Sequence, residues 1–162
     1  MSAPARTTPR PVASRPARGR TPALKALPTP APDVPSVQVL ELAEPLPGFP
    51  RHREYVLVPA EAGGHLFWLQ SVAPDGPRFL AVSAASFFPD YAPVLPVAAC
   101  DELELADAAE ASLFCLVTVP DGDASSATAN LRAPLVVNPV TRRARQLVLT
   151  DGVHAIRAPM RR

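Results

Sequence analysis

Short runs of apolar, β-branched and aromatic residues, separated by turn residues, make up most of the chain from Val37 onward. The first run alternates along the chain with the two-residue period of a strand. All seven runs have the length and the residue types of strands. Trp68 and Leu116 each lie within such a run and are predicted core residues. The predicted strands are residues 36–42, 55–58, 65–69, 79–82, 113–119, 135–137 and 146–149.

Turn-forming residues separate these runs. Glycine, proline and aspartate favour the backbone angles of tight turns. Short strands with frequent turns predict an all-β fold, either a small antiparallel β-barrel or a sandwich. The separating groups are Gly63-Gly64, Asp75-Gly76-Pro77, Asp121-Gly122-Asp123 and Asp151-Gly152.

Only residues 101–111 favour a helix, because they are rich in Glu, Leu and Ala and begin with Asp101, a suitable N-cap. Leu103 and Leu105 alternate with acidic residues, so a strand stays open for the same segment. Any helical structure in the domain is therefore expected to be short.

Residues 1–35 differ from the rest of the chain in composition. They contain nine prolines, no aromatic residue, and six basic residues against one acid, Asp33, which gives a net charge of +5. Proline fixes φ and removes backbone donors, and too little apolar surface is present to offset the loss of chain entropy on folding. We predict a disordered basic N-terminal tail, followed by one folded domain over residues 36–162 with a net charge of −4.

The sequence favours a cytoplasmic protein. No apolar stretch behind the basic N-terminus resembles a secretory signal, and no run approaches the roughly 20 residues that cross a bilayer. The tail resembles an organelle transit peptide in composition, but its prolines oppose the amphipathic helix that such peptides form. Cys100 and Cys115 have neither redox nor zinc-site spacing, which fits two reduced thiols.

The residue types expected of an enzyme are scattered. His52, His65 and His154 have no metal-ligand spacing, no serine lies in a Gly-x-Ser-x-Gly elbow, and the seven glycines form no phosphate-binding loop. We therefore predict a non-enzymatic protein without a metal or an organic cofactor. The acidic residues between positions 101 and 110 are interpreted as a solvated face, and a docking patch for a basic partner is the alternative.

An aromatic segment, called here the aromatic corner, is unusual. Three aromatic rings and a proline within five residues cannot all lie on one face of a strand, and the proline denies a ladder hydrogen bond. The segment is therefore predicted to be a rigid corner. Its rings plug the core, or some of them anchor a partner protein. The corner consists of Phe87, Phe88, Pro89, Asp90 and Tyr91.

A second unusual segment is residues 128–138, in which Asn130 and Asn138 bracket an apolar run. Asparagine caps its own backbone in turns, so structural roles are expected for both asparagines. Alternatively, Asn130, Leu131 and Arg132 lie on an exposed edge and bind a peptide. These three residues and the aromatic corner are the predicted partner-binding site.

Several motifs in this order and spacing resemble the FliW family. The combination of Leu-Gln-Ser, the aromatic corner and Thr-Ala-Asn-Leu-x-Ala-Pro is specific, and the resemblance covers roughly residues 37–160. The motifs are Pro47-Gly48-Phe49-Pro50, Phe67-Trp68-Leu69-Gln70-Ser71, the corner, residues 128–138 and Gln146-Leu147-Val148-Leu149.

This resemblance implies a small β-barrel-like fold and a regulator rather than a catalyst. FliW-like proteins bind flagellin and also CsrA, a dimeric RNA-binding repressor of translation. Free FliW sequesters CsrA and relieves the repression of flagellin translation, and accumulating flagellin then reclaims FliW. For this chain the resemblance implies a cytoplasmic, monomeric chaperone and CsrA antagonist in flagellum biogenesis.

Two other functions stay open from the residues alone. The basic tail, together with Arg142, Arg143 and Arg145, would suit a nucleic-acid-binding protein. A barrel could also bind a small ligand in a pocket, although no constellation of polar residues indicates one.

The predicted tail leads to a stability test. Removing residues 1–35 should lower the free energy of unfolding by less than about 1 kcal/mol, because the tail contributes no core. Thermal unfolding of the full chain is compared with that of a variant beginning at Ser36. A larger loss would contradict a tail that is dispensable for folding.

Overall fold

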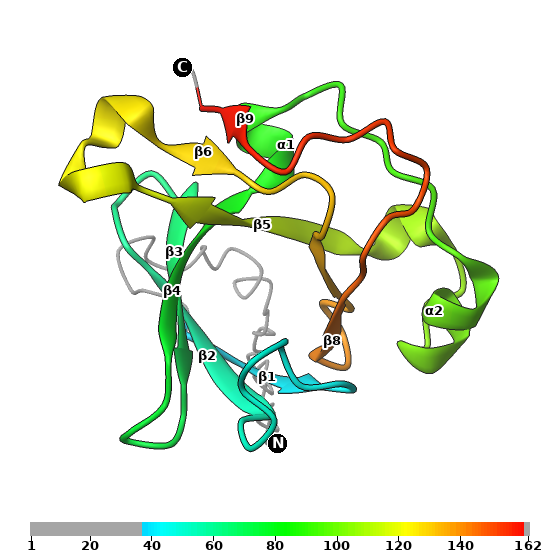
Figure 1. Ribbon diagram of the computed structural model, residues 1–162. Helices are drawn as coiled ribbons and strands as arrows, with labels where there is room; N and C mark the ends of the chain where they lie inside the picture. Colours follow the sequence, from blue (N-terminus) through cyan, green and yellow to red (C-terminus); the bar gives the residue numbers. More distant parts are fainter. Residues whose placement is uncertain (1–36, 161–162) are drawn as a thin grey trace, which may run out of the picture. The chain divides into compact units, whose positions relative to one another are not determined.

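Seven strands form a closed barrel in the computed structural model, which describes residues 37–160 (Figure 1). The predicted tail lies outside the described residues. The pairing order is β1-β2-β3-β4-β5-β7-β8, and β8 returns to β1. The β1–β8 pair is parallel and the other pairs of the ring are antiparallel. The strands are β1 (Gln38–Leu42), β2 (Glu54–Pro59), β3 (Leu66–Ser71), β4 (Arg78–Ser83), β5 (Ser112–Thr118), β7 (Leu135–Val137) and β8 (Arg143–Gln146).

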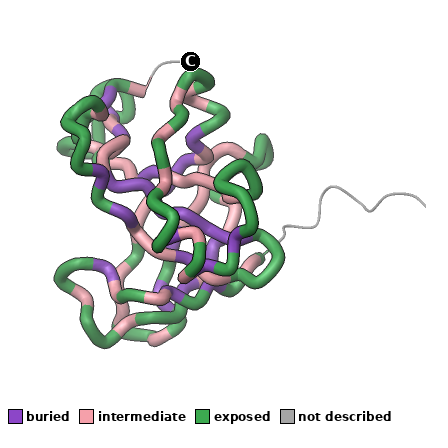
Figure 2. The backbone as a smooth tube through the Cα atoms, turned by 90° about the vertical axis from the view of Figure 1, so that its right-hand side faces the viewer, coloured by how far each residue is buried: buried purple, intermediate pink, exposed green. Residues whose placement is uncertain are grey.

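The closed ring of strands confirms the predicted all-β fold. Of the two predicted architectures, the domain is a barrel and not a sandwich. Two short strands, β6 (Thr128–Ala129) and β9 (Ala158–Pro159), extend the sheet beyond β5. Most fully buried residues lie in or next to the strands, and most of the connecting turns carry exposed residues. Figure 2 shows these buried and exposed stretches following one another along the backbone. The turn at Gly63 and Gly64 joins β2 to β3, and the turn at Asp75 and Gly76 joins β3 to β4.

The carboxylate of Glu61 closes the β2–β3 turn. It accepts hydrogen bonds from the amides of Gly63 (2.6 Å), His65 (2.7 Å) and Leu66 (3.2 Å). These amides, led by His65, lower the pKa of Glu61, because they stabilise the charged form. Gly64 has a φ of +76°, a conformation that glycine adopts without steric cost.

Three clusters of buried side chains hold the domain together. Alternation along β5 separates them, because Phe114 and Leu116 point into the barrel while Cys115 points out of it. The interior cluster fills the barrel, and the other two lie on its outer wall, one against helix α2 (Val97–Glu102) and one against helix α1 (Ala84–Phe87). The interior cluster is formed by Leu40, Leu42, Leu46, Tyr55, Leu57, Leu69, Leu135, Val137 and Ala144.

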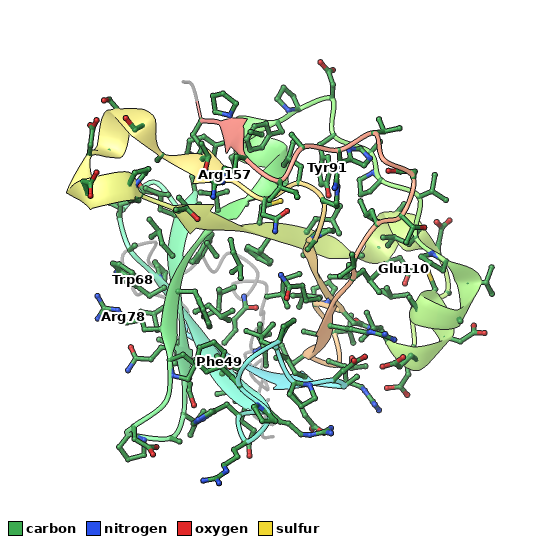
Figure 3. The ribbon with its side chains drawn as sticks, in the orientation of Figure 1. Phe49, Trp68, Arg78, Tyr91, Glu110 and Arg157 are labelled. Atoms are coloured by element: carbon green, nitrogen blue, oxygen red, sulfur yellow. The ribbon has the colours of Figure 1, made fainter. Side chains whose placement is uncertain are left out.

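The prediction that Trp68 lies in the core is wrong, whereas Leu116 does pack against the interior cluster. Phe67 and Leu69 point into the barrel, so Trp68 lies on the outer face and is only half-buried. The guanidinium carbon of Arg78 lies 3.9 Å from the centre of the Trp68 ring, as a cation–π pair (Figure 3). The apolar run predicted the strand but did not predict which face was buried.

Two other boundaries differ from the prediction. The predicted helix over residues 101–111 is replaced by α2, which begins after Pro96, so that Asp101 lies in its last turn. A proline before a first helical turn costs no hydrogen bond, which explains the earlier start. Glu104 follows with a φ of +58°, and the remaining helical structure there is a single 3₁₀ turn, Ala108–Glu110, capped by Asp107. Further 3₁₀ turns are Pro120–Gly122 and Ala124–Ser126.

The last predicted strand, residues 146–149, is also shifted, because β8 ends at Gln146. The chain beyond it stays beside the segment that precedes β7. The amide of Leu147 donates to Pro134 O (3.0 Å), and that of Leu149 donates to Arg132 O (2.7 Å). The side chains of Leu147 and Leu149 are both buried. The apolar residues of the predicted strand therefore do contribute to the core, although they lie beyond the end of the regular strand.

The interior cluster predicts the effect of a cavity. Leu69 is fully buried in it, so Leu69→Ala should lower the free energy of unfolding by about 2–5 kcal/mol. Val140→Ala, at a position that is 86% exposed, is the control and should change it by less than about 0.5 kcal/mol. Denaturant unfolding measures both. Similar, small effects of the two substitutions would contradict a filled barrel interior.

Candidate functional site

The aromatic corner (residues 87–91) turns the chain away from the barrel wall after α1. The amide of Phe88 donates to Ala84 O (2.8 Å) and that of Tyr91 donates to Phe88 O (3.0 Å), so two successive turns shape the corner. Pro89 and Asp90 are exposed, and all three rings are half-buried. The rings pack on the outer wall of the barrel, over the cluster of Val82, Ala84, Cys115 and Ala129.

Tyr91 ties the corner to the second predicted segment. Its hydroxyl donates to the carbonyl oxygen of Leu131 at 2.6 Å, a contact between residues 40 positions apart. Burial raises the pKa of Tyr91 above its usual range, with smaller contributions from Cys115 and Asp151. The hydroxyl is therefore a fixed, neutral donor that holds the corner in place.

Asn130 and Arg132 have structural contacts. The Asn130 side-chain oxygen accepts hydrogen bonds from the amides of Arg132 (3.0 Å) and Ala133 (3.2 Å), which is the capped turn expected of an asparagine. The Arg132 Nε donates to the carbonyl of His154 at 3.1 Å, and the Leu131 amide donates to Ala155 O at 2.9 Å. This turn therefore fastens the C-terminal segment across the domain.

The two predicted segments meet at one shallow hollow of about 380 Å³. It is lined by the five residues of the corner together with Leu131 and His154. The structure thus brings the corner and Leu131 to a common surface. Asn130 and Arg132 do not line it, but their hydrogen bonds fix the turn that carries Leu131 and the backbone at His154. We call the corner, Leu131 and His154 the corner surface.

His154 is a member of this surface that the sequence did not indicate. Its ring meets Tyr91 edge to face, with the ring centres 5.1 Å apart (Figure 3 labels Tyr91). Its Nε2 lies 3.6 Å from a carboxylate oxygen of Asp151. No local motif surrounds His154, so only the path of the C-terminal segment in the folded chain reveals it.

The acidic segment near α2 is partly neutralised by arginines. Arg145 reaches Glu102 at 2.6 Å and Glu44 at 2.8 Å, and Arg143 reaches Glu104 at 3.8 Å. Two of the three arginines that would suit nucleic-acid binding are therefore engaged within the domain. Within residues 101–110, the exposed carboxylates that have no ion pair to another described residue are Asp101, Asp107 and Glu110.

Other candidate chemistry is sparse in the part of the chain that the structure describes. There, no three His, Cys, Asp or Glu side chains gather as a metal site would require, and no helix could cross a membrane. Burial raises the pKa of the Cys115 thiol to about 12, as expected for a cysteine that packs as a small apolar residue.

The hydroxyl of Tyr91 predicts a stability difference between two tyrosines. Tyr91→Phe should lower the free energy of unfolding by about 1–2 kcal/mol, because the Leu131 carbonyl loses its donor while the ring remains. Tyr55→Phe is the matched control, because the buried Tyr55 hydroxyl has no hydrogen-bond partner within residues 37–160. That change should be neutral or stabilising in denaturant unfolding. A larger loss of stability from Tyr55→Phe than from Tyr91→Phe would contradict the assigned contacts.

Three comparisons with known proteins agree on a family. The family model described as FliW protein matches residues 30–160. The chain is 38% identical over 119 residues to a flagellar assembly factor FliW of Moorella thermoacetica, covering 74% of this chain and 75% of that protein. It is 36% identical over 124 residues to the one of Symbiobacterium thermophilum, covering 75% and 88%.

A solved structure supports the same assignment. The crystal structure of a flagellar assembly factor FliW superposes with a TM-score of 0.67 at 26% identity, over 75% of this chain and 84% of that one. The family resemblance of the motifs is thereby confirmed over the described domain. The chain belongs to the FliW family of flagellar assembly factors.

Proposed function

We propose that this protein is a cytoplasmic regulator that binds flagellin and sequesters a CsrA-type translational repressor, so that flagellin translation is relieved of repression. The observation that carries the proposal is membership of the FliW family over nearly the whole described domain. The relatives' names state a role in flagellar assembly. The identity of the two partners comes from the resemblance.

The charge of the domain supports a basic partner. Residues 37–160 contain eight arginines and no lysine against fourteen carboxylates. A protein of this charge attracts a basic RNA-binding protein and repels the phosphates of RNA. Sequestration of a repressor from its RNA would use both effects.

The corner surface supports a direct contact with a protein partner. Pro89 stiffens the loop, and the Tyr91–Leu131 hydrogen bond holds it to the domain, so little further ordering is needed on binding. Aromatic rings on such a rigid support make good anchors. We assign the contact itself to the corner and Leu131, and assign Asn130 and Arg132 to positioning them.

The side chains of the interior cluster pack against one another inside the barrel. This packing supports binding of a partner at the outer surface of the barrel. A function as a carrier of a ligand inside the barrel is not supported. The chain is accordingly proposed to act as a monomeric binding protein and flagellin chaperone rather than as an enzyme.

The proposal predicts the effect of a charge reversal in the corner. Asp90 is exposed at the tip, so Asp90→Arg should preserve folding and weaken partner binding at least tenfold, or about 1.4 kcal/mol. Affinity is measured for the full chain against purified flagellin and, separately, against CsrA from the same organism. Unfolding midpoints are measured on the same samples.

Asp75→Arg is the matched control, because Asp75 is exposed in the β3–β4 turn and receives the same change of charge. Its affinity should stay within twofold of that of the unmodified chain. Equal affinities of the Asp90 and Asp75 variants for a bound partner would reject the corner as the contact. Failure of the unmodified chain to bind either protein would reject the assigned partners and leave the family membership intact.

A further inference from the structure

Two sequence motifs that the proposed function does not use meet at one end of the barrel. The turn after Pro47-Gly48-Phe49 and the end of β3 at Leu69-Gln70-Ser71 border a second hollow of about 380 Å³. Arg51, His52 and Arg53 line it together with Glu54 and Ser71. This hollow shares no lining residue with the corner surface. Phe49, next to its first lining residue Pro50, lies in the lower half of the view in Figure 3, and Tyr91 lies in the upper part.

A hydrogen bond fixes the wall of this hollow. His52 Nδ1 lies 2.9 Å from the Ser71 hydroxyl oxygen, which also accepts a hydrogen bond from the Ala73 amide at 3.2 Å. The packing around the pair is tight. A Cβ atom at Gly76 would lie 2.3 Å from the Ser71 oxygen and 2.8 Å from His52 Nδ1, so only glycine leaves room for the pair.

The Ser71 side of this pair is buried. Ser71 is only 4% exposed, and a buried hydroxyl proton requires an acceptor. The Ser71 oxygen already accepts from the Ala73 amide, and His52 Nδ1 is the side-chain atom that completes its hydrogen bonding. His52 Nε2, the other ring nitrogen, has no hydrogen-bond partner within residues 37–160 and is left available to a ligand.

Arg51 and Arg53 belong to the lining of the same hollow as His52. Arg53 is held in place by a hydrogen bond from one of its terminal nitrogens to Ala43 O at 3.1 Å. Arg51 is exposed and has no ion pair inside residues 37–160. Glu54 is the single carboxylate in the lining, so cations exceed anions.

We propose that this hollow binds a small oxyanion of the phosphate type, free or carried by a small metabolite. The lining carries two arginines and a histidine against one carboxylate, and guanidinium groups bind phosphate oxygens well. His52 Nε2 has no hydrogen-bond partner within residues 37–160 and is available to such a ligand. The volume of this hollow, about 380 Å³, is at the lower end of the range for small-molecule sites. The proposal does not rest on the proposed partner binding, and either one can fail without the other.

The test is a titration of the full ¹⁵N-labelled chain at constant ionic strength, followed by NMR. The probes are inorganic phosphate, ribose 5-phosphate and, as the uncharged control, ribose. The phosphates should produce saturable shifts centred on the amides of Ser71 and Ala73 and on the His52 ring, and ribose should produce none. A lower dissociation constant for ribose 5-phosphate than for inorganic phosphate would identify a site for a phosphorylated metabolite. Equal dissociation constants would identify a site for the free anion.

Arg51→Ala should raise the dissociation constant for phosphate at least fivefold. Arg157→Ala is the matched control, because it removes one exposed arginine from the end of the domain opposite Phe49 (Figure 3) and should change the constant less than twofold. Arg51→Gln should behave as Arg51→Ala does, which guards against a folding defect in one variant. Equal losses for Arg51→Ala and Arg157→Ala, or shifts that do not saturate or are not centred on this hollow, would overturn the proposal.

Discussion

Strand β5 is the element on which both the barrel and the corner surface depend, because its two faces belong to different cores. Phe114 and Leu116 pack inside the barrel, while Cys115 packs beneath the aromatic rings outside it. The strand also pairs with β4 on one edge and with β6 and β7 on the other. Because interiors are close-packed, a shift of β5 would disturb the interior and the support of the corner together.

This double role explains how a short helix and a loop become a rigid surface. An isolated single helical turn such as α1 is unstable in water, because the entropy lost in fixing its backbone exceeds the stabilisation from its first hydrogen bond. Here the rings that follow α1 cover the outer wall of β4 and β5, and Tyr91 bonds to the Leu131 carbonyl. The turn at Asn130 fixes that carbonyl, and Arg132 holds the C-terminal segment alongside. The corner is thus positioned by residues from three separate parts of the chain.

The strands could be predicted from sequence because alternation, residue type and turn residues are local properties. Trp68 shows the limit of such reasoning, since an apolar run does not reveal which face the rest of the chain will cover. The shift of β8 has a similar cause, because Leu147 and Leu149 are buried without belonging to a regular strand. Helix α2 begins directly after Pro96, which is its N-cap, and Asp101 lies in the last turn instead of at the start where the prediction placed it.

The candidate site was predictable in part for the same reasons. Proline among aromatic rings and paired asparagines are local signals, and both segments lie where the structure forms one surface. The structural role of Asn130 follows from its residue type. Contacts across long separations were not predictable, and these include the Tyr91–Leu131 bond, the place of His154 and the pairing of His52 with Ser71.

The central claim is that the rigid corner, held on β5, is the face that a partner protein covers. Hydrogen–deuterium exchange of the full chain, with and without saturating flagellin or CsrA, tests this claim without altering the surface. The account predicts that bound partner slows exchange chiefly at the amides of residues 87–91 and 131, and leaves the turn at Asp75 unchanged. Slowed exchange confined to α2 and the acidic residues beside it, with the corner unchanged, would contradict it.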